Sequence, residues 1–150
     1  MDRRNGSSAG SSAGSSAALD AAARQVGDRW SLRVIGALLA GDRTFGELAT
    51  EVDGIAPTIL TARLRTLQRQ ALVTATPYAR RPLRMRYALT DPGRRLAAAI
   101  ATLAEWGAER EGHADRPVHR ACGTPIETRP WCPTCDEAVE DDDGDELVWC

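Results

Sequence analysis

The sequence contains no lysine, so all 19 of its basic residues are arginines. It has no run of about eighteen uncharged apolar residues, the minimum for a membrane-spanning helix. Its N-terminus lacks the apolar core of a signal peptide. It also lacks a Ser–His–Asp set, a phosphate-binding loop and a metal site with an open position. These absences argue against a membrane span, secretion and enzymatic chemistry, and we expect a cytoplasmic protein that is not an enzyme.

Acidic residues are missing from a long central segment. Between Ala56 and Thr90 there are seven arginines and no aspartate or glutamate. The formal net charge of −2 hides this asymmetry, because residues 17–112 sum to +4 whereas residues 113–150 sum to −7. A basic middle of this kind indicates a polyanionic partner.

The composition divides the chain into three parts. Residues 1–17 form the first part, and from Gly6 to Ala17 they repeat Gly-Ser-Ser-Ala without a bulky apolar side chain, which predicts a flexible arm. Residues 18–112 carry the helical and strand patterns of one globular domain. Residues 113–150 form a small tail with every cysteine and, at Glu140–Glu146, six acids in seven residues. We expect this acidic run to be a solvated turn; the alternative is that it competes with DNA for the basic middle.

Helical spacing of apolar residues begins near Ala18, and the more apolar run from Trp30 to Leu39 predicts a central buried helix. Thr44, followed three residues later by Glu47, predicts a capping box that opens a short helix. Pro57 suits the first position of the next helix. On that helix Ile59, Leu60, Leu64 and Leu67 are expected to be buried, and the opposite face carries Thr58, Thr61, Ala62, Arg65 and Arg69. A short helix, a turn and a helix with such an outer face outline a helix-turn-helix.

After Val73 the apolar period changes from helical to alternating, which predicts two strands around the loop 77–83. A β-hairpin directly after a recognition helix is a wing, and Arg80 and Arg81 would reach the DNA backbone or minor groove. The predicted fold is therefore α+β: a winged helix-turn-helix flanked by dimerisation helices and followed by a small tail.

A final helix is predicted from Thr90, as its cap, to Glu111. Its apolar stripe comprises Leu96, Ile100, Leu103 and Trp106. We expect this helix, together with residues 18–26, to form a dimer seam; the alternative is packing within one monomer.

The order of these motifs resembles the HxlR-type winged-helix transcriptional regulators, relatives of the MarR group. The matching stretches lie within residues 18–110 and include "GDRWSLRVIGALLAG" (27–41), "FGEL" (45–48), "GIAPTILTARLRTL" (54–67) and "YALTDPG" (87–93). The resemblance implies a homodimer that reads a pseudo-palindromic site in double-stranded DNA. It implies groove contacts by Pro57, Thr58, Thr61, Ala62 and Arg65, and wing contacts by Arg80, Arg81 and Arg84.

The sequence departs from that family at three places. Ala56 stands where the family usually has a capping Ser or Thr, so the recognition helix loses about 1 kcal/mol of capping. Ala71 stands where Gly usually follows this helix, and a left-handed alanine there adds about 1 kcal/mol of strain. The first helix has no cysteine, which excludes the thiol sensing that some members perform there.

The tail carries two ligand pairs, "HRACG" (119–123) and "CPTCD" (132–136), with nine residues between the pairs. Two tight turns with this spacing can face each other across one tetrahedral ion. The sequence therefore predicts a structural zinc site in a zinc-ribbon-like tail, with His119, Cys122, Cys132 and Cys135 as ligands. Cys150 is a rival for the fourth position.

Two other interpretations of the cysteines remain: disulfides, which cytosolic chains seldom keep, and a redox or metal switch that alters DNA affinity. For the whole chain, the rival to a sequence-specific DNA-binding regulator is a protein–protein adaptor on the transcription machinery. An adaptor of that kind would have no consensus DNA site.

Overall fold

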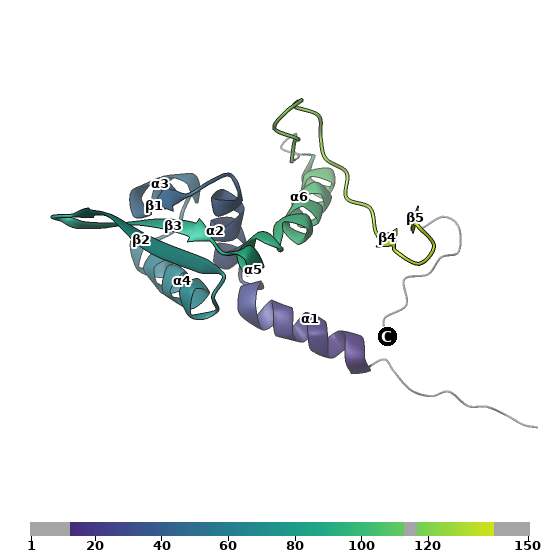
Figure 1. Ribbon diagram of the computed structural model, residues 1–150, viewed down its shortest axis with the longest axis horizontal. Coiled ribbons are helices and arrows are strands. Elements are labelled where there is room, and N and C mark those ends of the chain that lie inside the picture. The colour runs from purple at the N-terminus through teal and green to yellow at the C-terminus, as the bar shows by residue number, and fades with distance from the viewer. Residues whose placement is uncertain (1–12, 113–116, 140–150) are drawn as a thin grey trace, which may run out of the picture.

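The computed structural model describes residues 13–112 and 117–139, and Figure 1 traces its elements. Most of the predicted arm (1–12), the acidic run (140–146) and Cys150 lie outside the described residues. Among the described residues, no helix has the length and apolarity that crossing a bilayer requires.

The domain alternates helices with a small antiparallel sheet. Its three strands lie in the order β1-β3-β2, and a separate two-stranded ladder lies in the tail. The elements are α1 (Ala13–Val26), α2 (Arg29–Leu39), β1 (Arg43–Thr44), α3 (Phe45–Glu51), α4 (Pro57–Arg69), β2 (Val73–Arg80), β3 (Leu83–Leu89), α5 (Asp91–Arg94), α6 (Ala97–Glu111), β4 (Trp131–Cys132) and β5 (Glu137–Ala138). This is the predicted α+β winged helix-turn-helix architecture.

The central helix is α2, as the sequence predicts, because it contacts α3, α4, α6 and β3. Its buried face joins apolar side chains of α3, α4 and β3 in one core, which includes Val34, Ile35, Leu38, Leu48, Leu60, Leu64, Leu67 and Leu89. Ile59, which we predicted to be buried, is instead 37% exposed. One residue before Leu60, it is rotated by about 100° from the core-facing direction.

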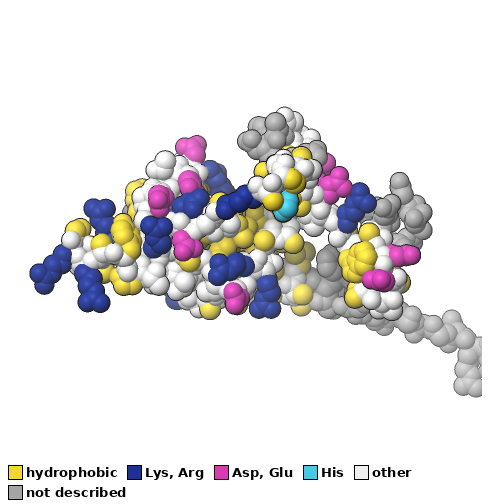
Figure 2. Space-filling model, turned by 45° about the horizontal axis from the view of Figure 1, so that its top comes forward, with side chains coloured by type: hydrophobic (Ala, Val, Ile, Leu, Met, Phe, Trp, Pro, Cys, Tyr) yellow, Lys and Arg dark blue, Asp and Glu magenta, His cyan; other side chains and the backbone are white. Residues whose placement is uncertain are grey.

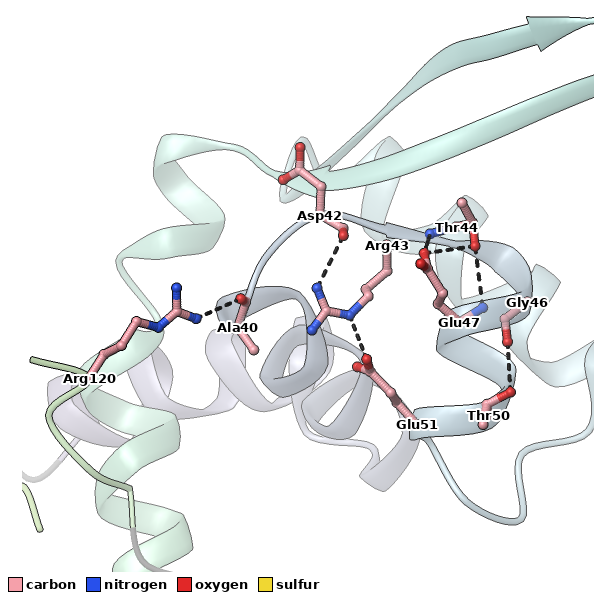
Figure 3. Close-up of polar contacts among 9 residues, drawn as sticks. All are labelled: Ala40, Asp42, Arg43, Thr44, Gly46, Glu47, Thr50, Glu51 and Arg120. Carbon is pink, nitrogen blue, oxygen red and sulfur yellow. Dashed lines mark hydrogen bonds and ion pairs between the residues drawn. The ribbon is translucent and has the colours of Figure 1, made fainter. Parts of the chain in front are cut away.

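Side-chain caps begin three of these helices: α2, α3 and α5, where Thr90 is the predicted cap. The Glu47 N–H donates to the Thr44 hydroxyl, and the Thr44 N–H donates to the Glu47 carboxylate at 2.6 Å, which confirms the capping box (Figure 3). These hydrogen bonds from Thr44 lower the pKa of Glu47. Asp28 caps α2 by accepting from the N–H groups of Trp30 and Ser31, each at 3.1 Å. The sequence analysis missed this second cap.

The two departures from the family pattern that the sequence predicts at the ends of α4 are both present in the structure. Ala56 makes no side-chain capping hydrogen bond. Ala71 has a φ of 56°, in the left-handed region. The Leu72 N–H donates to the Leu67 carbonyl at 2.9 Å, which is the 6→1 bond of a Schellman motif. The motif is therefore complete although its left-handed position holds alanine instead of glycine.

We expect Ala71→Gly to raise the free energy of unfolding by about 1 kcal/mol, since glycine adopts the left-handed conformation without a Cβ clash. Urea denaturation of the two proteins measures the change. Ala62→Gly is the matched control: it lies inside the same helix and should lower stability by about 1 kcal/mol. Equal losses in both variants would contradict the prediction.

The hairpin is longer than expected. We predicted a loop over residues 77–83, but β2 continues to Arg80 and β3 begins at Leu83. The pairing of β2 with β3 is irregular between Pro77 and Ala79, where Tyr78 is the extra residue. One extra residue on one strand lets pairing resume past a proline that has no N–H to donate.

The helix predicted over Thr90–Glu111 is instead two helices, α5 and α6. The turn between them follows from close packing at Gly93, where a Cβ would lie 2.2 Å from the Leu72 carbonyl oxygen. The N–H of Thr90 donates to the same oxygen at 3.0 Å. These contacts fix α5 against the end of α4, and the chain turns at residues 95–96 before α6 packs on α2.

At the other end of the domain, α1 begins at Ala13. Its first turn lies inside the segment 1–17 that we predicted to be an arm. Alanine has the highest helix propensity, and the Gly-Ser repeat gives way to alanine-rich sequence after residue 16.

Candidate nucleic-acid interface

The outer face of α4 lies in solvent at most positions. Pro57, Thr58, Ala62 and Arg65 are exposed, and Thr61 is half-buried. The Thr61 hydroxyl donates to the Pro57 carbonyl at 2.8 Å, so its oxygen still has capacity to accept. The structure therefore places all five predicted groove residues on one accessible face.

The arginines of α4 divide into two kinds. The Arg63 guanidinium lies 3.3 Å from the Asp28 carboxylate and ties α4 to the start of α2. Burial alone would raise the pKa of Asp28, but hydrogen bonding from Ser31 and the Arg63 charge bring it below its usual value. Arg65, by contrast, makes no hydrogen bond or ion pair with any residue in the described parts of the chain. Arg63 is therefore structural and Arg65 is available to a ligand.

Arg65 also lies close to the base of the hairpin. Burial raises the pKa of the Tyr87 hydroxyl on β3, and the positive charge of Arg65 acts in the opposite direction. The charge of Arg65 on α4 is therefore felt at β3, the strand that leads back from the hairpin tip. The helix also contacts β2, the other strand of the hairpin.

The hairpin projects from the domain and ends in a group of positive side chains (Figures 1 and 2). Arg80, Arg81 and Arg84 are all exposed around its tip. Within residues 13–112 and 117–139 they form no ion pair or hydrogen bond. Arg86, two residues after Arg84 on β3, stacks on Tyr78 with its guanidinium 5.5 Å from the ring centroid. The tip thus carries three uncompensated positive charges.

The two acidic residues of α3, Glu47 and Glu51, hydrogen-bond with Thr44 and Arg43, which directly precede the helix. The Arg43 guanidinium donates to Glu51 at 2.6 Å and to the Asp42 carbonyl at 3.1 Å, and Glu47 completes the capping box (Figure 3). These contacts hold β1 against α3. None of these hydrogen bonds involves α4 or the hairpin tip.

A second exposed surface is apolar and lies on the helices that flank this domain. Leu96, immediately before α6, and Ile100 of α6 are half-buried against the core, whereas Leu103 and Trp106 of α6 are 52% and 60% exposed. On α1, Leu19 is 62% exposed. In Figure 1 both helices extend from the end of the domain opposite to the hairpin tip. The predicted apolar stripe therefore packs against the monomer core at Leu96 and Ile100, and it is exposed at Leu103 and Trp106.

The predicted metal ligands are only partly assembled. His119 Nδ1 and Cys122 Sγ lie 3.3 Å apart, and hydrogen bonding with Thr124 lowers the pKa of the Cys122 thiol. Cys132 and Cys135 occupy the ladder of β4 and β5 and the turn between these strands. Among the residues that the structure describes, no three potential ligands converge on one point. The two pairs are thus separate turns, and Cys150 is outside the described residues.

Comparisons with known proteins agree on one family. A model of the HxlR-like helix-turn-helix family matches residues 25–115. A chain from Mycobacterium tuberculosis named as an uncharacterised HTH-type transcriptional regulator is 38% identical over 122 residues, covering 79% of this chain and 77% of its own. A solved structure of a candidate transcription factor from Pseudomonas aeruginosa is 29% identical with a TM-score of 0.61, covering 79% of this chain and 83% of its own. One from Enterococcus faecalis, named as a candidate regulator of the MarR family, is 27% identical with a TM-score of 0.56, covering 72% and 96%.

Proposed function

Because the chain belongs to the HxlR-like helix-turn-helix family, whose curated relatives are named transcriptional regulators, we propose that it is a homodimer that binds a pseudo-palindromic operator. The observation that carries this proposal is the exposure of Arg65 on the outer face of α4 and of Arg80, Arg81 and Arg84 at the hairpin tip. Binding to chromosomal DNA agrees with the cytoplasmic location predicted from the sequence.

In this proposal α4 enters the major groove with its N-terminal half toward the bases. Arg65 donates two parallel hydrogen bonds to a guanine through its planar guanidinium group. Thr58, Thr61 and Ala62 are short enough to let the helix approach base edges and thymine methyl groups. The uncapped N–H groups after Ala56 are free to donate to a backbone phosphate, which would supply the missing cap.

The hairpin acts as a wing on the flanking duplex. Arg80, Arg81 and Arg84 contact phosphates or enter the adjacent minor groove, where positive side chains gain from the strong negative potential. These contacts add affinity without reading base identity. They also release counterions, so operator binding should weaken steeply as salt rises.

Dimerisation follows from the exposed apolar residues of α1 and α6. Two copies that bury Leu19, Leu103 and Trp106 against each other would remove these side chains from water, which stabilises association. A two-fold axis through this seam presents two recognition helices, and a palindromic operator matches that symmetry.

The proposal is tested by selecting bound duplexes from a random pool and titrating the selected operator by fluorescence anisotropy. We expect Arg65→Ala to lower operator affinity by about 10- to 100-fold and to relax the preference at one base position in each half-site. Arg81→Ala should weaken selected and random DNA equally and reduce the salt dependence of binding.

Arg94→Ala is the matched control for charge. Arg94 is exposed on α5 and, among the residues that the structure describes, its side chain pairs with Asp91 alone, at 3.7 Å, so its removal should leave both affinities unchanged. Wild-type affinity in both Arg65→Ala and Arg81→Ala would overturn the assignment of this surface. Selection that yields no consensus would instead favour the protein–protein adaptor.

A further inference from the structure

The tail contains one local structure twice. The first hairpin (117–126) and the second hairpin (130–139) are related by an offset of thirteen residues, and an Arg-Pro pair opens both in the sequence. Each hairpin has an antiparallel pairing of its second residue with its ninth: Val118 with Pro125, and Trp131 with Ala138. The outer hydrogen bonds also match, from Ile126 N–H to Pro117 O at 2.8 Å and from Val139 N–H to Pro130 O at 2.9 Å.

The turns at the two tips are equivalent as well. Gly123 N–H donates to the His119 carbonyl at 2.7 Å, and Asp136 N–H donates to the Cys132 carbonyl at 2.9 Å. Gly123 and Asp136 both have positive φ, at 72° and 60°. In each hairpin a potential metal ligand thus stands at the first and fourth positions of a tight turn closed by a left-handed residue. Such a turn holds its two ligand side chains close together.

The side chains of the first turn already have a spacing suited to metal binding. Two tetrahedral ligands, a nitrogen at about 2.1 Å and a sulfur at about 2.3 Å from zinc, lie about 3.6 Å apart. His119 Nδ1 and Cys122 Sγ are 3.3 Å apart. Imidazole and thiolate groups are also the donors that zinc prefers. The chemistry and the local geometry therefore fit one ion.

The repeat decides between the two candidates for the fourth ligand. The thirteen-residue offset that relates Cys122 to Cys135 also relates His119 to Cys132. His119 therefore completes the set by position, whereas Cys150 lies outside both hairpins. We propose that the two hairpins bind one zinc ion through His119, Cys122, Cys132 and Cys135, and that this closed four-ligand site is structural.

The lack of buried residues in the tail explains why it would need a metal ion to fold. No residue between Pro117 and Val139 is buried, and its large apolar side chains, including Val118, Ile126 and Trp131, are exposed. A segment this short cannot bury enough apolar surface to fold alone, and a structural zinc supplies that free energy. The residues that join the hairpins, 127–129, belong to no helix or strand. One shared ion would bring the two turns together across this connection.

The first hairpin is attached to the domain that carries α2 and α6. The Arg120 guanidinium donates to the Ala40 carbonyl at the end of α2 at 3.0 Å (Figure 3). Val118, His119 and Ile126 line a groove of about 910 Å³ together with Ile100 and Ala104 of α6. The zinc site would therefore be anchored on the regulator through its first turn.

The test is metal analysis of the full chain, purified with zinc and dialysed. We expect one zinc per chain, and we expect Co²⁺ substitution to give the visible absorption of a tetrahedral site with thiolate ligands. His119→Ala and Cys135→Ser should each weaken zinc binding by more than about 100-fold, since even outer-shell partners account for about 10- to 100-fold. Cys150→Ser is the matched control and should retain one zinc.

Wild-type protein without stoichiometric zinc would overturn the proposal. Loss of zinc in Cys150→Ser with retention in His119→Ala would overturn the ligand set. Circular dichroism and operator binding of each variant report separately on folding and on the DNA-binding surface. Metal content does not depend on DNA recognition, so failure of this inference and failure of the proposed function give different results.

Discussion

Replacing Leu103 by glutamate is expected to convert the protein to a monomer and to lower its affinity for the full operator by at least about 100-fold. A dimer binds its second half-site intramolecularly, and this effective concentration contributes about 10²–10⁴ to affinity. A carboxylate at Leu103 would have to be buried unpaired in the seam, which is strongly unfavourable. Size-exclusion chromatography with light scattering measures the oligomer, and anisotropy measures affinity for the operator and for one half-site.

The fold itself should tolerate this change. Leu103 is 52% exposed in the single chain, so the glutamate reaches water in the monomer and the melting temperature should fall little. Leu103→Met is the matched control, because it keeps the side chain apolar and should remain a dimer with normal operator affinity. Half-site affinity should be equal in all three proteins, since α4 is untouched.

A second variant addresses α1. Leu19→Glu introduces the same charge on the other helix that the proposal places in the seam, where Leu19 is 62% exposed. If both glutamate variants stay dimeric and bind the operator normally, the seam does not involve these faces. If only Leu103→Glu dissociates, α6 forms the interface without α1.

Structural features that depend on residues only a few positions apart could be predicted from the sequence. The capping box at Thr44 and Glu47 needs only a three-residue spacing, and it is present. The left-handed position at Ala71 followed from the family resemblance, because glycine usually stands there, and its φ is positive. The exposed outer face of α4 followed from helical periodicity, although Ile59 at its edge was misassigned. Local rules were therefore reliable for the surface that we propose binds DNA.

Features fixed by distant residues could not be predicted in this way. Asp28 and Arg63 are 35 positions apart, and nothing in the local pattern shows that Arg63 pairs with Asp28. Arg120 contacts Ala40, 80 positions away. The repeat in the tail was visible in principle, but the two hairpins share few residue types. Their equivalence became clear only from matching hydrogen bonds and φ angles.

The break between α5 and α6 belongs to this second group, and it gives a prediction for Gly93. A Cβ on this residue would lie 2.2 Å from the Leu72 carbonyl oxygen and 3.1 Å from Leu89 Cδ2. Neither neighbour can move freely. The Leu72 carbonyl also accepts the N–H of Thr90 at 3.0 Å, and Leu72 and Leu89 are both buried in the core.

We expect Gly93→Ala to lower the free energy of unfolding by about 3 kcal/mol, which combines overpacking with weakened hydrogen bonds. For a domain of this size the melting temperature should fall by about 12–24 °C. Gly46→Ala is the matched control: a Cβ there meets nothing within 4 Å, so stability should stay the same or rise slightly. Equal melting temperatures for Gly93→Ala and the wild type would show that the close approach at Leu72 does not constrain the chain.

Contacts of Thr90 beside Gly93 link the surface that we propose binds DNA to the proposed dimer seam. Thr90 caps α5 through the N–H of Gly93 and also donates its hydroxyl to the Ala71 carbonyl at 2.6 Å. The end of α4, the base of the hairpin and the start of the helix pair α5–α6 therefore meet at one joint. In a dimer built through α6, this joint sets the distance between the two recognition helices. Gly93→Ala should therefore reduce operator affinity at temperatures where the variant is still folded, while half-site affinity is retained, because a misdirected α6 misplaces the second half-site.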